Sequence, residues 1–179
     1  MAKGKLVCII GCTGSGKTPI CKELYKRIPN SVIFNMERGH GGRIYNPYKL
    51  EKYKKKPNKI IYFFGSFVFL FDLLIRSYKF NKLRKQGKDI ICDRYYDLHL
   101  MPNVTKLIEL LSVLLMPKPD YLFKLDVSYE ELLKTDKGKI IGSHNLMLEI
   151  LNINHIDNTI SISGFNLKER VNAIIKCIK

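Results

Sequence analysis

The sequence predicts a three-layer α/β domain, in which a parallel β-sheet lies between two layers of helices. Short runs rich in β-branched and aromatic residues alternate with longer helical patterns, as in repeated βαβ units. The run LVCII at 6–10 is apolar at every position, which is typical of strands buried on both faces of a parallel sheet. At 179 residues the chain fits a single domain, 1–179, that can bury a real core.

The first half of the chain is expected to hold three strands and two helices. Pro19 falls in the first turn of the first helix, where a missing N–H is tolerated, and Pro29 stops that helix. Gly87 marks the end of the second helix. Strands are predicted at 6–10, 31–34 and 89–92, and helices from the glycine-rich loop to about residue 28 and from about 63 to 85.

Helix-start signals and a proline predict where the elements of the second half of the chain begin and end. Ser128 with Glu131, and Asn166 with Glu169, have the spacing of a capping box. Pro117 stops the helix that precedes the fourth strand. The predicted elements are a helix from Asn103 or Thr105, a strand at 121–127, a helix through Lys134, a short helix at 145–151, a strand at 158–162 and a last helix to Lys179.

The chain is strongly basic. It has 31 Lys and Arg against 16 Asp and Glu, a net charge of +15, which implies an anionic partner such as a nucleotide, a nucleic acid or a membrane surface. The excess is concentrated at 49–88, within a basic acceptor-side region expected at 36–88. A solvated face of a lysine-rich protein is the alternative interpretation of that region.

Cysteine usage and hydropathy bear on the compartment. The five cysteines lack C-x-x-C spacing, which suits a reducing compartment, so we expect a cytoplasmic protein. The most apolar stretch, 60–75, is shorter than a bilayer span and contains Asp72, and Gly65 and Ser66 interrupt it. We therefore expect a buried helix and no membrane partner.

A glycine-rich loop, GCTGSGKT, follows the first predicted strand. It matches the phosphate-binding pattern G-x-x-x-x-G-K-[ST], and it lies between a strand and a helix, as this pattern requires. Lys17 would reach the β- and γ-phosphates of a nucleotide, and Thr18 would offer its hydroxyl to Mg²⁺. A glycine turn that binds no ligand is the alternative. The expected phosphate-binding residues are Gly11, Thr13, Gly14, Ser15, Gly16, Lys17 and Thr18.

A second motif, CDRYYD, coincides with the end of the third predicted strand. Asp93 falls at the sheet edge where α/β folds bind ligands, so it is a candidate Mg²⁺ ligand. Arg94 can hold a phosphate through two hydrogen bonds, although a salt bridge at the strand end is the alternative. Tyr95 is a candidate to stack on a base or to pack beside the strand. Glu37 is a candidate catalytic base, metal-shell ligand or loop cap.

Taken together, these motifs resemble the thymidylate kinase-like P-loop kinases. The resemblance covers most of the chain. Besides the glycine loop it rests on MERG at 36–39, Arg76 in the apolar helix, DRYYD at 93–97 and PKPDYLFKLDVSYEELLK at 117–134.

The resemblance implies a fold and a reaction. The fold is the P-loop NTPase fold, with five parallel strands in the order 2-3-1-4-5. The reaction is transfer of the γ-phosphoryl group of ATP to a nucleoside monophosphate, with ATP and Mg²⁺ as cofactors. The resemblance further implies that Arg76 and Arg94 hold the acceptor phosphate, that Glu37 lies near the reacting groups and that the chain forms a homodimer.

The chain departs from the family pattern at three places. Thr13 stands where the family has an acidic residue, and Met36 and Arg38 replace an arginine and a proline. The expected lid, 134–143, carries lysines instead of arginines, and lysine lacks the planar fork of a guanidinium. Because positioning and charge neutralisation dominate phosphoryl transfer, these changes predict a slower or redirected reaction.

The sequence therefore predicts an ATP- and Mg²⁺-dependent phosphotransferase with a nucleotide substrate, thymidylate being the leading acceptor. Three alternatives stay open. The chain could bind nucleotides without turnover, or it could phosphorylate a nucleoside. It could also bind nucleic acid through the basic region and act on 5′ ends, although the most basic part, KYKKKPNK, has a single aromatic residue for stacking.

Overall fold

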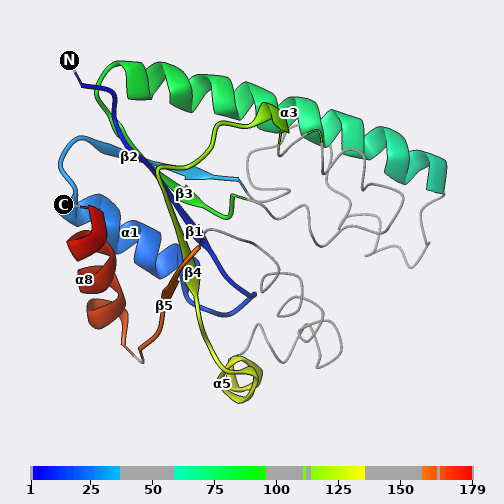
Figure 1. The fold of residues 1–179 in the computed structure, drawn as a ribbon. Coiled ribbons are helices and arrows are strands. Elements are labelled where there is room, and N and C mark those ends of the chain that lie inside the picture. Colours follow the sequence, from blue (N-terminus) through cyan, green and yellow to red (C-terminus); the bar gives the residue numbers. More distant parts are fainter. Residues whose placement is uncertain are drawn as a thin grey trace.

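A five-stranded parallel sheet forms the centre of the molecule (Figure 1). The computed structural model describes residues 2–36, 59–95, 111, 114–135, 159–164 and 166–178, and the side chains of helix α3 at residue 67 and from residue 70 onward. The strands are β1 (Leu6–Ile10), β2 (Ser31–Asn35), β3 (Asp89–Asp93), β4 (Tyr121–Leu125) and β5 (Ile160–Ile162). Their order, β2-β3-β1-β4-β5, confirms the predicted topology.

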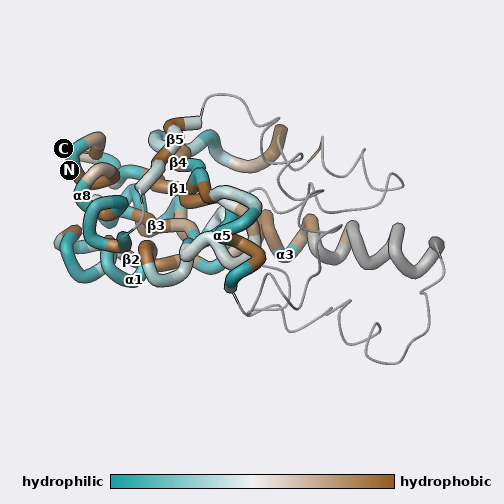
Figure 2. Tube along the Cα trace, turned by 90° about the horizontal axis from the view of Figure 1, so that it is seen from below, coloured by the Kyte–Doolittle hydropathy of each residue, from teal (hydrophilic) through white to brown (hydrophobic). Residues whose placement is uncertain are grey.

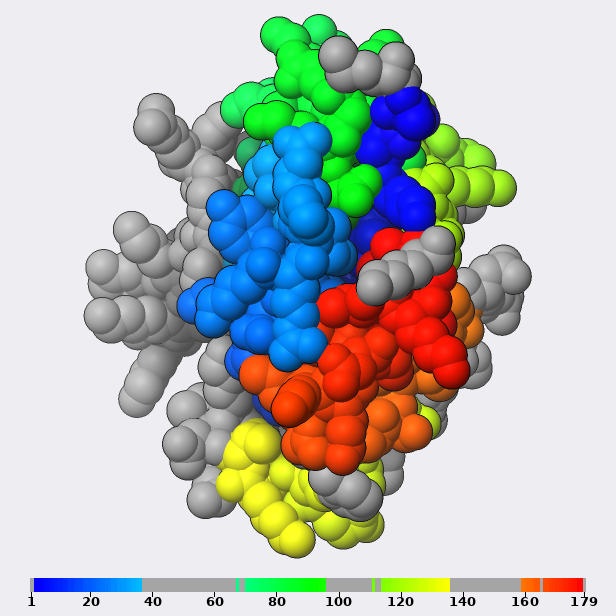
Figure 3. All heavy atoms as spheres, turned by 90° about the vertical axis from the view of Figure 1, so that its left-hand side faces the viewer, coloured from blue at the N-terminus to red at the C-terminus, as the bar shows by residue number. Residues whose placement is uncertain are grey.

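Helices cover both faces of the sheet. The described helices are α1 (Lys17–Arg27), α3 (Lys59–Lys85), α5 (Tyr129–Lys134) and α8 (Leu167–Ile178). Helix α3 lies on one face, and α1 and α8 lie next to each other on the opposite face (Figures 1 and 3). The predicted three-layer α/β architecture is thereby confirmed.

Strand β1 contributes to the core on both of its faces. Leu6, Cys8 and Ile10 pack into the cluster under α3, whereas Val7 and Ile9 pack into the cluster under α1 and α8. All five side chains are buried, and burial of a large aliphatic side chain stabilises a fold by about 1.5–3 kcal/mol. Figure 2 shows this hydrophobic interior as brown segments along the central strands.

The core also contains free thiols. Burial raises the pKa of Cys8 and of Cys21 well above the usual value for a thiol, and the neighbouring Cys92 raises both further. Cys8 and Cys92 are register partners on β1 and β3. These thiols therefore remain protonated and act as small apolar side chains.

Helix α3 differs in two respects from the helix predicted in this region. It begins at Lys59, before the expected start near residue 63. It is also not buried all round, since Phe71, Ile75 and Tyr78 are exposed while Phe80 and other residues on the sheet side are buried. A single apolar face is enough to pack the helix on the sheet. None of the described helices combines the length and hydrophobicity needed to cross a bilayer.

The predicted helix caps are observed. Ser128 and Glu131 form a reciprocal capping box at the start of α5, and Asn166 Oδ1 accepts from Glu169 N at 2.8 Å before α8. Gly87 adopts a φ of 80° after α3. Strand β4 ends at Leu125, earlier than predicted. Outside the described residues lie positions 37–58, the predicted helix start at 103–105, the lid from 136 to 143, and the short helix at 145–151.

A buried arginine and partly exposed carboxylates close the amino end of the sheet. Arg84 is 3% exposed, donates from Nε to Gly4 O at 2.9 Å and forms an ion pair with Asp120. Asp120 also accepts from Leu6 N, and Asp89 Oδ1 accepts from Lys5 N at 2.7 Å. We call Gly4, Lys5, Arg84, Asp89 and Asp120 the amino-end cluster. It joins β1 to α3, to β3 and to the start of β4.

Candidate functional site

The loop between β1 and α1 has two glycines in backbone conformations that favour glycine. Gly14 and Gly16 both have a φ of 89°, in the left-handed region that other residues rarely adopt. A Cβ on Gly14 would also lie 2.6 Å from Thr135 Oγ1. Gly16 is the N-cap of α1 and provides no side-chain cap, so the first N–H groups of the helix are available to an anion.

Lys17 places a cation inside this loop. Its side chain is buried, and Nζ donates to the carbonyl oxygens of Gly11 at 2.7 Å and of Cys12 at 2.6 Å. Ser15 Oγ is buried and has no hydrogen-bond partner among the described residues. An ammonium group and an unsatisfied hydroxyl thus share one loop, and both can bind phosphate oxygens.

Thr18 and Asp93 are in direct contact at the carboxyl end of the sheet. Thr18 Oγ1 donates to Asp93 Oδ2 at 2.6 Å. Asp93 is 2% exposed, and its other oxygen, Oδ1, has no hydrogen-bond partner within the described part of the chain. Burying an unsatisfied carboxylate oxygen is costly. Hard divalent cations prefer oxygen ligands of this kind, so Thr18 and Asp93 fit a Mg²⁺ ion.

Arg94 directly follows Asp93 in an unusual backbone conformation. Its φ is 65°, and its N–H donates to Ile9 O at 3.0 Å. The left-handed region costs a residue with a Cβ about 1–2 kcal/mol, and such strain is concentrated at functional sites.

Arg76 reaches the same end of the sheet from α3. Its guanidinium donates to Asn35 O at 3.0 Å and forms an ion pair with Asp72 one turn earlier. Asn35 is the register partner of Asp93. Arg76 therefore lies beside the strand ends that carry Asp93 and Arg94.

Tyr95 lies in the core of the described part of the chain. Tyr95 is 2% exposed, its hydroxyl donates to Pro117 O, and its ring lies 6.5 Å from that of Phe80. Tyr95 is thus placed to pack in the core, and its position gives no support to the predicted contact with a substrate. Glu37 lies outside the described residues, and Thr13 is half-buried in the loop.

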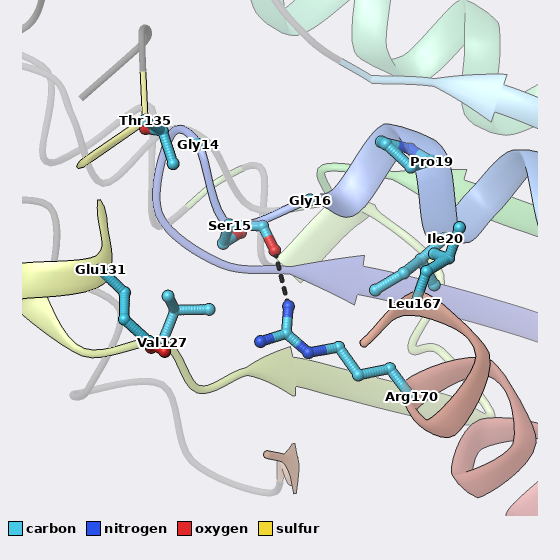
Figure 4. Close-up of a pocket in the computed structure, with 10 residues that line it drawn as sticks. All are labelled: Gly14, Ser15, Gly16, Pro19, Ile20, Val127, Glu131, Thr135, Leu167 and Arg170. Carbon is cyan, nitrogen blue, oxygen red and sulfur yellow. Dashed lines mark hydrogen bonds between the residues drawn. The ribbon is translucent and has the colours of Figure 1, made fainter. Parts of the chain in front are cut away.

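A cavity of about 300 Å³ adjoins the glycine-rich loop (Figure 4). Val127 and Glu131 lie on one side of it, and Ile20 and Leu167 lie on the other. Arg170, from the first turn of α8, extends between them toward the loop. The complete lining is Gly14, Ser15, Gly16, Pro19, Ile20, Val127, Glu131, Thr135, Leu167 and Arg170.

Two further residues contact the loop, and only Thr135, which lies within the expected lid 134–143, was indicated by the sequence. Arg170 Nη1 donates to Ser15 O at 3.0 Å across 155 residues of sequence. Thr135 caps the end of α5 and lies against Gly14. The helix start at Asn166 is the only local signal near Arg170, and it does not indicate which way the arginine points.

Comparisons with known proteins bear on the fold. No protein-family model matches the chain, and no curated protein matches its sequence. Among solved structures it is similar to thymidylate kinase from Candida albicans, at 18% identity and a TM-score of 0.73 over 99% of this chain and 92% of that one. Deoxyadenosine kinase from M. mycoides, solved with bound dATP, has 20% identity and a TM-score of 0.62 over 96% and 97%. Thymidylate kinase from Ehrlichia chaffeensis has 18% identity and a TM-score of 0.57 over 99% and 100%. At these identities the likeness establishes the fold.

Proposed function

We propose that this chain is a Mg²⁺-dependent phosphotransferase of the nucleotide kinase type, with ATP as donor and a nucleoside monophosphate, thymidylate first, as acceptor. The observation that carries the proposal is the Thr18–Asp93 contact of 2.6 Å beside the glycine loop, with Asp93 Oδ1 buried and unsatisfied. Solved structures of similar fold include thymidylate kinases and a deoxyadenosine kinase, and they support a reaction of this class.

The donor side of the proposal rests on the loop and the cavity. The N–H groups at the start of α1 and the ammonium of Lys17 would bind the β- and γ-phosphates. Thr18 and Asp93 would hold Mg²⁺, which when bound neutralises charge on the transferred group. The cavity of about 300 Å³ beside Gly14–Gly16 is at the small end of the range of ligand pockets, and it has room for the nucleoside part of a donor.

The reaction needs little covalent chemistry from the protein. The bond between the γ-phosphorus and the β,γ-bridging oxygen breaks, and a bond from the same phosphorus to an acceptor oxygen forms. An oxygen of a monophosphate carries no proton at neutral pH, so this acceptor needs no general base. The task of Lys17 is then to stabilise the charge on the phosphates and to keep them in line with the acceptor. Glu37 remains a proposed participant near the reacting groups.

The acceptor side of the proposal rests on two arginines. Arg94 and Arg76 would hold the acceptor phosphate, since guanidinium groups can bind phosphate through two parallel hydrogen bonds. Arg76 is already paired with Asp72, which lowers the positive potential available there. That pairing favours a second candidate, a nucleoside acceptor, which brings no phosphate and would need a base to remove the hydroxyl proton. The similarity to a deoxyadenosine kinase supports the same alternative.

Acceptor-dependent release of ADP tests the proposed function. The purified chain would be given ATP and Mg²⁺ with each nucleoside monophosphate and each nucleoside in turn, in a coupled assay. We expect release with a monophosphate, greatest with thymidylate, and an increase of the acceptor KM in Arg76→Gln. Arg27→Gln is the matched control, because Arg27 is paired one turn away with Glu23 as Arg76 is with Asp72, but at the end of α1 that is away from the loop.

Each outcome of the assay selects one interpretation. Release of ADP with nucleosides alone would identify a nucleoside, and not a monophosphate, as the acceptor. Tight ATP binding with no release for any acceptor would show a nucleotide-binding protein without turnover and would defeat the enzymatic proposal.

A further inference from the structure

Arg170 connects the last helix to the phosphate loop. Its Nη1 donates to Ser15 O at 3.0 Å (Figure 4). Its Nε donates to Gly164 O at 2.8 Å in the turn between β5 and α8. The side chain is half-buried and lines the cavity beside the loop. One guanidinium thus joins the turn after β5 to the centre of the loop.

The loop needs an external support at this point. Ser15 lies between Gly14 and Gly16, and both glycines adopt left-handed backbone conformations. Glycine has access to a wide range of backbone angles, so the Ser15–Gly16 peptide is free to rotate unless something holds it. Backbone hydrogen bonds hold the groups on either side of this peptide, since Ser15 N donates to Cys12 O at 3.1 Å and Gly16 O accepts from Ile20 N at 3.2 Å, but neither involves the Ser15 carbonyl.

The contact with Arg170 restricts that peptide. A trans peptide group carries its C=O and its N–H on opposite sides. When Arg170 holds the carbonyl of Ser15, the N–H of Gly16 is directed away from Arg170 and away from the cavity side of the loop. The bond is charge-assisted, and its donor is itself fixed by Gly164 O, so the peptide is held in one orientation.

We propose that Arg170 is a positioning residue of the donor site, which fixes the Ser15–Gly16 peptide so that the Gly16 N–H is preorganised for a phosphate oxygen. The inference rests on the proposed function in that it takes the ligand of the loop to be a triphosphate. Arg170 acts on the phosphates through the loop backbone and not by contact with the base. Lysine cannot replace it fully, because one ammonium lacks the planar fork that spans Ser15 O and Gly164 O.

The chain offers a matched control for this role. Arg27 also joins α8 to the neighbouring part of the molecule, since its Nη1 donates to Asn172 Oδ1 at 2.8 Å and its Nε donates to Glu23 at 3.0 Å. It does not line the cavity. Arg27→Gln removes the same charge and a comparable contact to α8, but it leaves the loop peptide supported.

The test compares Arg170→Gln, Arg170→Lys and Arg27→Gln with the wild type by calorimetric titration of ATP and, separately, of inorganic tripolyphosphate. We expect Arg170→Gln to raise the Kd for both ligands by the same factor, about 10- to 100-fold. The Kd should rise less in Arg170→Lys, and in Arg27→Gln it should stay within about twofold of the wild-type value. Hydrogen exchange of the ligand-free variants gives a second measurement, in which the peptide spanning 12–17 exchanges faster in Arg170→Gln alone.

Three results would overturn the inference. These are an unchanged Kd in Arg170→Gln, a Kd in that variant that rises for ATP but not for tripolyphosphate, or an equal rise of the Kd in Arg27→Gln. The first denies any role, the second assigns Arg170 to the nucleoside, and the third reduces it to a support of α8. A wild type that binds ATP tightly but transfers no phosphate defeats the kinase proposal and leaves this inference standing. A wild type that binds no triphosphate overturns both.

Discussion

The two ends of the sheet use the same types of charged residue in opposite ways. In the amino-end cluster, Arg84 is buried but forms an ion pair with Asp120 and donates to Gly4 O. At the carboxyl end, Asp93 is equally buried, but one of its oxygens has no partner among the described residues. The next residue, Arg94, adopts a left-handed backbone.

This difference separates stability from function within one sheet. Satisfied charges at the amino end hold β1, α3 and the start of β4 together. An unsatisfied oxygen and a strained backbone at the carboxyl end are costs that a ligand can offset, as is usual for sites. Substitutions at the amino end should therefore change stability, and substitutions at the carboxyl end should change binding.

The largest expected effect is that of Lys17→Ala on catalysis. Removing the ammonium from the loop should lower kcat/KM for ATP about 10³-fold, because in the proposed reaction this ammonium stabilises charge in the transition state. The free energy of unfolding, measured in urea, should change little by comparison. A loss of stability larger than that of Asp120→Ala would contradict the assignment of Lys17 to binding.

Asp120→Ala should have the largest effect on stability. It leaves the buried guanidinium of Arg84 without its ion pair, and because Asp120 is itself 43% exposed the free energy of unfolding should fall by about 1–3 kcal/mol. Urea denaturation measures the change, and Glu23→Ala, which breaks an exposed pair, is the control that should change it much less. The Kd for ATP of the folded variant should equal that of the wild type. A higher Kd would contradict the assignment of stability to the amino end and of binding to the carboxyl end.

Arg94→Gly should show the smallest and most informative change. Removing the Cβ relieves the left-handed strain and should raise the free energy of unfolding by up to about 1 kcal/mol. The acceptor KM should rise while the Kd for ATP stays constant. Asn30→Gly is the control, because Asn30 has a φ of 60° in a turn far from the loop and asparagine tolerates that region. A variant that is less stable than the wild type would remove the argument from strain.

The elements predicted correctly from the sequence are those with local signals. An unbroken apolar run identifies β1, glycine spacing identifies the loop, and the side chains at Ser128 and Asn166 mark helix starts. The position of Asp93 follows from the strand it ends. Each of these features depends on neighbours within a few residues.

The features that were missed depend on contacts between distant segments. Arg170 reaches Ser15, and Arg84 reaches Asp120, across parts of the chain with no shared pattern. The left-handed backbone at Arg94 is likewise indicated by no local residue pattern. The exposed side of α3 was not predicted, because apolar residues lie all around this part of the helix and no polar face marks the side that contacts solvent.

The central place of β1 in the sheet has a consequence for biosynthesis. β1 pairs with β3 and β4, and the contact between Lys5 and Asp89 spans 84 residues. At about 5–20 residues per second, a ribosome needs roughly 4–17 s to make that intervening segment. During this time an all-apolar strand has both edges open, which is the condition for pairing with other chains. The nascent chain should therefore need chaperones most between the emergence of β1 and that of β3.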